Sequence, residues 1–287
     1  MIVRRPAWIV FAFALVLCLI GGISHVAAVP PPSPEQVKQE IARLAWQRGP
    51  IEGRIGNIAA IKVAEDRAFL DGPNTRRFLE LNGNPPRDDR YALVDPRSDW
   101  FAIFFFENTG YVKDDEKLDP DALLASLQAH DKDRNAERER LGMPPLHTDG
   151  WHVPPHYDLA TKRLEWGVRL RGGRSEAPIV NYSIRLLGRR GVMHAVLVSE
   201  PEHLDRDVAE FKAALGGYEF LSGERYAEFR AGDRIAEYGL AALVLGGAAA
   251  VATKSGFGKA IAKFVVVGGA ALGSAVVALF RRLTRRG

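Results

Sequence analysis

Residues 100–107 read Trp-Phe-Ala-Ile-Phe-Phe-Phe-Glu, and this run decides the class of fold. Aromatic residues at this density are typical of a strand buried in a sheet. Asn108-Thr109-Gly110 is a turn sequence, after which we expect a second strand that ends near Lys113. The same reasoning predicts further strands at 149–153, 162–171, 177–187, 191–199 and 218–221, and two more between residues 53 and 71.

Helical segments are predicted on either side of these strands. Residues 29–49 begin with a proline-rich linker and continue into a short helix, because apolar residues such as Val37 and Ile41 recur at helical spacing. Strands outnumber helices and short turns join them, so the sequence predicts an α+β domain over residues 50–232, an antiparallel sheet with packed helices. The other predicted helices cover residues 73–81, 120–140 and 201–215.

The first 28 residues (1–28) have the pattern of an export signal peptide. Arg4 and Arg5 precede an apolar run from Trp8 to Ile20. Val26-Ala27-Ala28 then offers compact residues for cleavage after Ala28. The alternative is an uncleaved anchor, and both alternatives export the domain that follows. The single cysteine of the chain lies within this segment, which excludes a disulfide scaffold and a zinc site made of cysteines.

Two apolar segments near the carboxyl end have the length of membrane-spanning helices. Residues 235–253 and 260–280 carry one charge each, and about 20 residues of helix cross the hydrocarbon core of a bilayer. A basic tail follows at residues 281–287. If both segments span, the tail lies on the exported side, which conflicts with the preference of arginine for the cytoplasmic side. A single span, with the other segment re-entrant or interfacial, removes the conflict, and the sequence leaves both arrangements open.

The distribution of charge excludes nucleic acid as a partner. The whole chain has a net charge of +4, but residues 29–234 hold 30 basic and 34 acidic residues, a net charge of −4. The excess of basic residues flanks or interrupts the apolar segments, which is typical of membrane topology rather than of a phosphate-binding surface. With 47% hydrophobic and 26% charged residues, the chain also has the composition of a folded protein rather than a disordered one.

A histidine-containing stretch at residues 150–158 comes closest to a metal site. His152, His156 and Asp158 offer imidazole and carboxylate groups, which suit zinc. Two prolines between the histidines exclude a helix and interrupt a strand, so the spacing does not place these ligands on one face. We therefore expect a rigid loop here that holds no metal ion and no cofactor.

The same loop is a candidate platform for a partner, with aromatic faces packed on the sheet edge and polar tips outward. A second candidate follows the predicted turn at 108–110. There Asp114 and Asp115 could hold calcium or act as acid and base, although such a pair more often ends a solvated strand. The candidate partner-binding residues are Trp151, Tyr157, Tyr111, Lys113, Asp114 and Asp115.

Several motifs together resemble one bacterial family of membrane-anchored proteins. They read NGNPP at 82–86, DWFAIFFFENTGYVKDDE at 99–116, ERERLGMPPL at 137–146, GWHVPPHYD at 150–158, VNYSIRLLGRRGVMHAVLV at 180–198, and YGLAAL at the start of the first apolar segment. As a set they resemble the family catalogued as domain of unknown function 2167, over about residues 50 to 285. The resemblance implies an exported domain tethered by a C-terminal membrane segment, and it implies no activity. More loosely, the closing order of strand, glycine turn, strand, helix and strand is similar to the α+β fold of the photosystem oxygen-evolving accessory proteins.

These observations predict a non-enzymatic envelope protein whose exported domain binds another envelope protein. We expect the chain at the inner (cytoplasmic) membrane, with its main domain on the periplasmic side. The alternative is a hydrolase of the cell envelope. It would use a metal ion at the histidine stretch or the carboxylates of Asp114 and Asp115.

Overall fold

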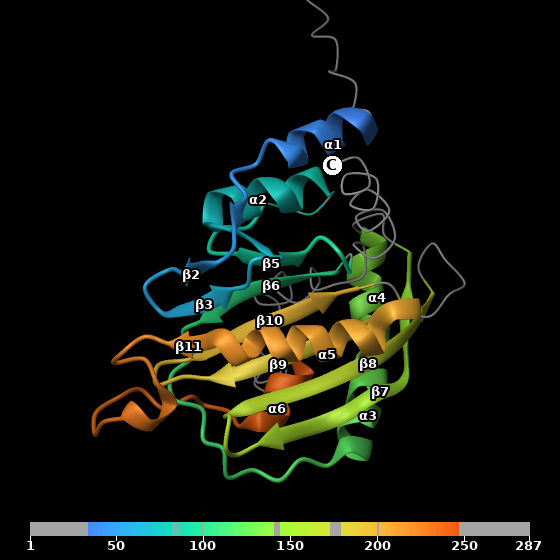
Figure 1. Ribbon diagram of the computed structural model, residues 1–287. Coiled ribbons are helices and arrows are strands. Elements are labelled where there is room, and N and C mark those ends of the chain that lie inside the picture. The colour runs from blue at the N-terminus through green and yellow to red at the C-terminus, as the bar shows by residue number, and fades with distance from the viewer. Residues whose placement is uncertain are drawn as a thin grey trace, which may run out of the picture. The chain divides into compact units, whose positions relative to one another are not determined.

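The computed structural model of the chain describes residues 34–82, 84, 86–98, 100–140, 144–172, 179–199 and 201–246 (Figure 1). The predicted signal peptide, the second apolar segment and the basic tail lie outside these residues. So do residues 247–253 of the first apolar segment.

The described residues contain two antiparallel sheets, six α-helices and three short 3-10 helices, so the predicted α+β class with a large antiparallel sheet is confirmed. The large sheet has the order β1-β4-β5-β6-β10-β9-β8-β7, and the small one has the order β11-β3-β2. The strands are β1 (Gln47–Arg48), β2 (Ile51–Ile55), β3 (Ala59–Val63), β4 (Ala68–Leu70), β5 (Tyr91–Asp95), β6 (Trp100–Glu107), β7 (Leu146–Asp158), β8 (Arg163–Gly172), β9 (Ile179–Leu187), β10 (Val192–Val198) and β11 (Tyr218–Phe220). The helices are α1 (Pro34–Ala42), α2 (Gly72–Leu81), α3 (Pro120–Ala129), α4 (Asp131–Arg140), α5 (Leu204–Ala214) and α6 (Leu240–Leu245).

The front face of the large sheet, toward the viewer in Figure 1, is covered by α5 and by the small sheet. Alternate residues of β6 point to this face, among them Trp100 and Phe104, and both are fully buried. The ring of Phe211 in α5 packs edge-on against both, with centroids 5.8 and 6.3 Å away. Tyr218 of β11 stacks on Phe104 at 6.5 Å. The predicted aromatic strand is therefore the centre of the main apolar cluster.

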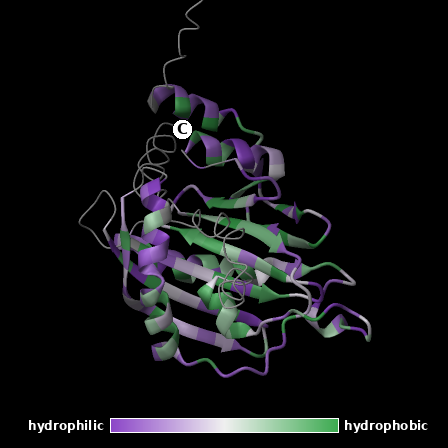
Figure 2. Ribbon diagram, turned by 180° about the vertical axis from the view of Figure 1, so that it is seen from behind, coloured by the Kyte–Doolittle hydropathy of each residue, from purple (hydrophilic) through white to green (hydrophobic). Residues whose placement is uncertain are grey.

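The back face of the large sheet is covered by helices in two separate places. At one end α1 and α2 pack on β5 and β6, and the ring of Phe78 meets Phe101 edge-on at 5.3 Å. At the other end α3 and α6 pack on β8 through Leu164 and Trp166. Seen from behind, the strands in the middle of the sheet are mainly hydrophobic (Figure 2). β6 is thus buried on both faces, as its sequence predicts.

The segment after β6 differs from the strand predicted there. Residues 108–119 form no ladder, and Tyr111 makes only an isolated parallel bridge to Ile235. The reason is that β6 is already paired with β10 on one side and with β5, which was not predicted, on the other. A chain leaving β6 meets β10 along residues 101–107 on one side and β5 along residues 100–104 on the other, so most of both edges is already occupied. The predicted helix at 120–140 is also two helices, α3 and α4, which meet at His130.

β7 runs through the two prolines that were expected to interrupt it. The strand extends from Leu146 to Asp158 and includes Pro154 and Pro155, so the prediction of a loop there was wrong. β7 is an edge strand, where a missing N–H can face away from the sheet without loss. Its register with β8 shifts at three places, and these irregularities accommodate the prolines.

Polar side chains of α4 bind the backbone of the first half of β7. The side chain of Asn135 accepts a hydrogen bond from the Leu146 N–H and donates one to the Leu146 carbonyl, both at 2.8 Å. The carboxylate of Asp131 accepts the N–H of Thr148 at 2.7 Å. These bonds satisfy groups on the outer edge of the strand that no neighbouring strand reaches.

The first predicted membrane segment is folded with the domain in its described part. Residues 235–239 are not helical, and α6 ends at Gly246 with a left-handed φ of 116°. Leu240, Leu243 and Val244 are buried in the cluster that also holds the back-face residues of β8. The folded unit therefore reaches Gly246, beyond the predicted domain end at 232. No helix of the described residues is long and apolar enough to cross a membrane.

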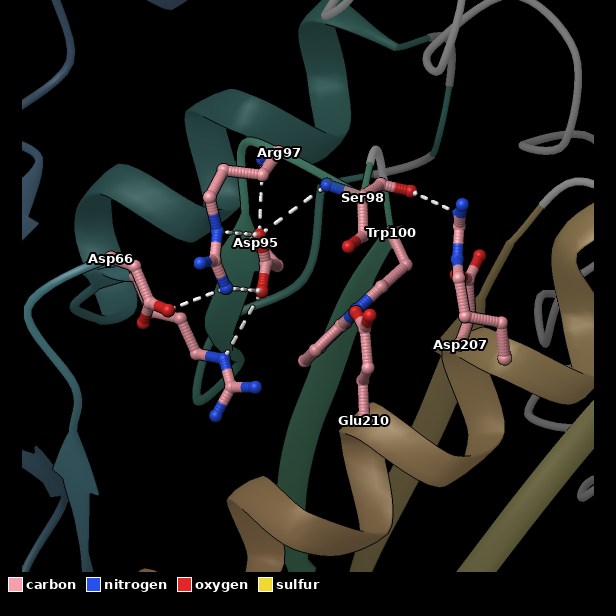
Figure 3. A network of polar contacts seen from close by, with 9 residues as sticks. Asp66, Asp95, Arg97, Ser98, Trp100, Asp207 and Glu210 are labelled. Carbon is pink, nitrogen blue, oxygen red and sulfur yellow. Dashed lines mark hydrogen bonds and ion pairs between the residues drawn. The ribbon is translucent and has the colours of Figure 1, made fainter.

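A buried carboxylate fixes the hairpin between β5 and β6 (Figure 3). Asp95 is 0% exposed, and its Oδ1 accepts the N–H groups of Arg97 and Ser98 at 3.0 and 3.4 Å. Arg67 reaches its Oδ2 at 3.3 Å and Arg97 reaches it at 3.2 Å. Burial alone would raise the pKa of the Asp95 carboxyl. The hydrogen bonds from Arg97 and the charges of both arginines outweigh burial and hold the pKa below its usual range.

Substitution inside α6 tests whether this helix belongs to the core. Leu243 is 1% exposed, so Leu243→Ala should lower the free energy of unfolding of the full chain by about 2–5 kcal/mol. The matched control is Leu245→Ala, because Leu245 is half-buried in the same helix and should cost less. Urea unfolding followed by tryptophan fluorescence measures both. Equally small losses at the two positions would contradict the packing of α6 on the domain.

Candidate functional site

Three segments that meet at one end of the large sheet carry exposed apolar side chains. In the described part of the chain, three large apolar side chains are exposed: Leu159 by 65%, Ile235 by 47% and Phe229 by 38%. Leu159 lies in the turn between β7 and β8, Ile235 bridges to Tyr111, and Phe229 packs against the Tyr111 ring at 4.3 Å. We call this surface the aromatic end, and it consists of Tyr111, Asp114, Tyr157, Leu159, Lys162, Tyr226, Phe229 and Ile235.

Stacked tyrosines form the floor of the aromatic end. The rings of Tyr111 and Tyr226 stack with centroids 4.4 Å apart. The hydroxyl of Tyr226 donates to the carbonyl of Val112 at 2.9 Å, which ties the segment after β6 to the segment before α6. Rigid aromatic side chains of this kind offer a large contact area at a small entropic cost.

Asp114 is the polar centre of the aromatic end. Its Oδ2 accepts hydrogen bonds from the Tyr157 hydroxyl at 2.9 Å and from the Lys162 ammonium at 2.7 Å. The same ammonium lies 5.1 Å from the centre of the Tyr226 ring. Two predicted candidates, Asp114 and Tyr157, are therefore brought together, and Lys162 joins them from the turn after β7.

The electrostatics of this centre keep the protonation states of Asp114 and Tyr157 fixed at neutral pH rather than poised for proton transfer. Partial burial would raise the pKa of the Asp114 carboxyl, but the hydrogen bonds from Lys162 and Tyr157 outweigh it and hold the pKa below its usual range. Burial, helped by the charge of Asp114, raises the pKa of the Tyr157 hydroxyl. At neutral pH the carboxyl is thus ionised and the phenol protonated. A general acid or base works best with a pKa near the working pH, and neither group has one.

The other predicted partner-binding residues lie around this centre with different roles. Tyr111 belongs to the aromatic end, as described above. Lys113 and Asp115 are exposed on either side of Asp114. Trp151 instead packs toward α3, and its indole N–H donates to the carbonyl of Pro120 at 3.0 Å. Trp151 therefore has a structural role on the back face.

The predicted metal ligands point to separate places. His152 Nε2 lies 2.8 Å from Asp205 Oδ1 of α5. His156 is exposed opposite Glu165 in the ladder with β8. Asp158 caps its own turn, accepting the Ala160 N–H at 2.8 Å. In residues 34–246, so far as they are described, no group of three or more histidine, cysteine, aspartate or glutamate side chains is arranged to hold a metal ion.

Sequence reasoning missed a row of side chains on the back face of the large sheet. Arg90, Phe105, His194 and Arg185 lie side by side across β5, β6, β10 and β9. We call these four residues the charged row. The available signal was a charged residue within each of two strands rich in apolar residues, Glu107 at the end of β6 and Arg185 in β9.

Comparison with known proteins gives a family and a slight structural likeness. The family model described as a protein of unknown function, DUF2167, matches residues 47–279, which confirms the resemblance seen in the motifs. A search of the curated proteins finds no match. Among solved structures, the chain is similar to cyanobacterial PsbP (CyanoP) from Synechocystis sp. PCC 6803. The sequences are 8% identical, the TM-score is 0.34, and the match covers 62% of this chain and 94% of that one.

The carboxylate at the aromatic end has a testable effect on stability. Asp114→Asn should lower the free energy of unfolding by about 1–3 kcal/mol at pH 7, because two charge-assisted hydrogen bonds are weakened. The folded pKa of Asp114 lies below its unfolded value, so this stabilisation is complete above the unfolded pKa and is lost as pH falls through the folded one. The difference between wild type and variant should therefore shrink below about pH 4.

Asp115→Asn is the matched control for this measurement. Asp115 is the exposed neighbour, and its substitution should change the free energy of unfolding by less than about 0.5 kcal/mol. Denaturant unfolding at several pH values measures both variants. A difference for Asp114→Asn that stays constant down to pH 3 would show that the carboxylate charge is not what stabilises the site.

Proposed function

Because this chain belongs to the family of proteins of unknown function DUF2167, whose description names no activity, we propose its function from the geometry of the aromatic end. The proposal is a non-enzymatic, membrane-tethered domain that binds another envelope protein at this surface. The observation that carries it is that Leu159, Phe229 and Ile235, the exposed large apolar side chains of the described residues, lie in three segments that meet at the stacked rings of Tyr111 and Tyr226.

The composition of this surface fits a protein partner. Contact sites between proteins depend on a few aromatic or large apolar anchors, with polar groups around them. Here Phe229 and Leu159 would be the anchors, and the exposed side chains of Lys113 and Asp115 lie beside the ion pair of Asp114. The floor is held by stacked rings and by the hydroxyl of Tyr226, so binding would order few additional groups.

The same geometry argues against the hydrolase alternative at this surface. The carboxylate of Asp114 is neutralised by Lys162 and bonded to Tyr157, with a pKa shifted away from neutral pH. A carboxylate in that state is a poor general acid or base. The aromatic end is therefore better suited to contact with a partner protein than to proton transfer.

The fold of residues 235–246 supports one of the two membrane arrangements that the sequence left open. These residues belong to the domain, so residues 260–280 are the remaining apolar segment of spanning length. A single span there, with the domain exported, puts the basic tail at 281–287 on the cytoplasmic side. That arrangement satisfies the preference of arginine for the cytoplasm. We propose the inner membrane as the location, with the domain on the periplasmic side.

Reporter fusions test this topology. Alkaline phosphatase fused after Gly246 should be active, and green fluorescent protein fused there should be dark, because the domain is exported. Green fluorescent protein fused after Gly287 should be bright. A dark fusion after Gly287 together with an active phosphatase would contradict the single span at 260–280, and an inactive phosphatase would contradict export.

Paired variants test the binding surface. Leu159→Ser with Phe229→Ser removes both anchors, and Ala160→Ser with Ala227→Ser places the same residue at exposed neighbours in the same two turns. Tagged full-length chains are purified from membranes after mild cross-linking, and the proteins recovered with each are compared. We expect a partner that is recovered with wild type and control but is lost with the first pair. Equal recovery with both pairs, or no recovered protein at all, would contradict the proposal.

A further inference from the structure

The charged row lies between the two helix-covered areas of the back face. Phe105 is opposite His194 in the ladder of β6 and β10, and His194 is opposite Arg185 in the ladder of β10 and β9. Arg90 immediately precedes β5. Phe105, His194 and Arg185 occupy back-facing positions of their strands, and the side chain of Arg90 lies on the same face over the Phe105 ring. They form a continuous line across the sheet, remote in sequence and adjacent in space.

Aromatic rings lie against the two guanidinium groups of the row, and the carboxylate of Glu107 acts on both through its charge. Arg90 lies over the ring of Phe105 at 3.9 Å, and Phe105 stacks on the His194 ring at 4.2 Å. At the other end Arg185 lies over the ring of Trp166 at 4.8 Å. Stacking of this kind positions a guanidinium group and leaves its N–H edge free to donate hydrogen bonds.

The row carries an excess of positive charge. The carboxylate of Glu107 is committed to His194, whose Nε2 lies 2.9 Å from Glu107 Oε2. Neither Arg90 nor Arg185 forms an ion pair with any described residue, and their nearest acceptors are the backbone carbonyls of Asp88 and Ile184, at 3.5 and 3.2 Å. Burial lowers the pKa of each guanidinium to about 10, so both stay charged at neutral pH. With Arg87 and Asp89 also acting on Arg90, three cations and two anions meet in a partly desolvated place, and the one unbalanced positive charge is costly without a further partner.

Two buried polar atoms in the row have no hydrogen-bond partner. They are Nε of Arg185 and Nδ1 of His194. His194 is 8% exposed, so water does not readily satisfy it. The two residues are directly opposite on neighbouring strands, where Cβ atoms lie about 4.5–5.5 Å apart. These two unsatisfied atoms lie beside an excess of positive charge, and this combination favours the binding of an oxyanion.

Arg163 is an arginine of the same sheet that lies outside the charged row. It lies on β8, its Nε is also buried without a partner, and its Nη2 donates to the Leu215 carbonyl at 2.8 Å. Its position next to Leu164, which points to the back face, places it on the front face of the sheet. It is opposite Leu186 rather than a histidine. Arg163 is therefore a natural control for the row.

We propose that the charged row binds a phosphate group, held by the Nε–H of Arg185 and by the ring of His194, with Arg90 contributing charge. The site is separate from the aromatic end, and the inference does not depend on the function proposed there. The phosphate group could be free or carried by a lipid headgroup, since the contacts are the same. A tetrahedral oxyanion would accept hydrogen bonds from Arg185 in the geometry that guanidinium groups favour.

Binding is coupled to a proton on His194. Without an anion, burial and the charges of Arg185 and Arg90 hold the pKa of the ring well below its usual value, so the ring is neutral. The charged or titratable groups near the row are Arg87, Asp89, Arg90, Glu107, Arg185 and Tyr238. A bound anion opposes the arginine charges and favours the imidazolium, whose Nδ1–H would then donate to it. Affinity should rise as pH falls from about 8 to about 6.

Sulfate titration of the full-length chain in detergent tests the proposal, because sulfate keeps a constant charge over this pH range. Calorimetry should show binding that strengthens toward pH 6. Arg185→Gln should weaken it about tenfold or more. Arg163→Gln should leave it unchanged. His194→Gln should bind without the pH dependence, since glutamine takes up no proton. Circular dichroism verifies that each variant is folded.

Equal sulfate affinity in wild type and Arg185→Gln would overturn the proposal and indicate an adventitious ion only. An equal loss in Arg163→Gln, or no binding at either pH, would overturn it as well. Inorganic phosphate and a short-chain phosphatidic acid, each compared between wild type and Arg185→Gln, then distinguish the sources. Tighter binding of the free ion indicates a soluble phosphate compound, and tighter binding of the lipid indicates a headgroup.

Discussion

Strand β6 is paired along its length with β5 and β10 and is buried on both faces, and the rest of the structure is arranged around it. Successive side chains of β6 point to opposite faces of the sheet, so the order of its residues decides what packs on each face. Trp100 and Phe104 meet α5 and the small sheet in front, whereas Phe101 meets α2 behind. The hairpin that joins β6 to β5 is held by the carboxylate of Asp95, which is buried and therefore must be paired. A slip of one residue in β6 would exchange its two faces and would also move the charged row.

Local patterns predicted the elements whose signal lies within their own sequence. The aromatic run of β6, the helices α2 and α5 and the strands β8 to β10 fall close to their predicted ranges. What failed depends on partners that are distant in the chain. The strand expected after Gly110 is absent because β5 and β10 already flank β6. Pro154 and Pro155 read as a break, yet they are compatible with a strand once that strand lies at an edge. The predicted domain ends at residue 232, whereas the described fold continues through α6, which is apolar on its own and shows its packing only through contacts with α3 and β8.

The candidate site was found in part for the same reason. Asp114 and Tyr157 were selected from separate motifs, and the structure joins them by a hydrogen bond. Lys162, Tyr226 and Phe229 complete that surface from segments that carry no local signature. The charged row was missed because each member looks ordinary within its own strand. Only the register of four strands brings them into line, and the two unsatisfied atoms appear only when the side chains are placed.

The outer edge of β7 bears on how the protein behaves at high concentration. An exposed strand edge is a template on which another copy can add a strand, and such growth leads to aggregation. Along β7 this exposed edge is blocked in two places. Near its start, Asn135 and Asp131 of α4 occupy the backbone groups of Leu146 and Thr148. Near its end, two prolines supply no N–H groups, and shifted registers bend the strand. The opposite edge, β1, is two residues long. Both outer edges of the eight-stranded sheet therefore offer little backbone on which another copy could add a strand.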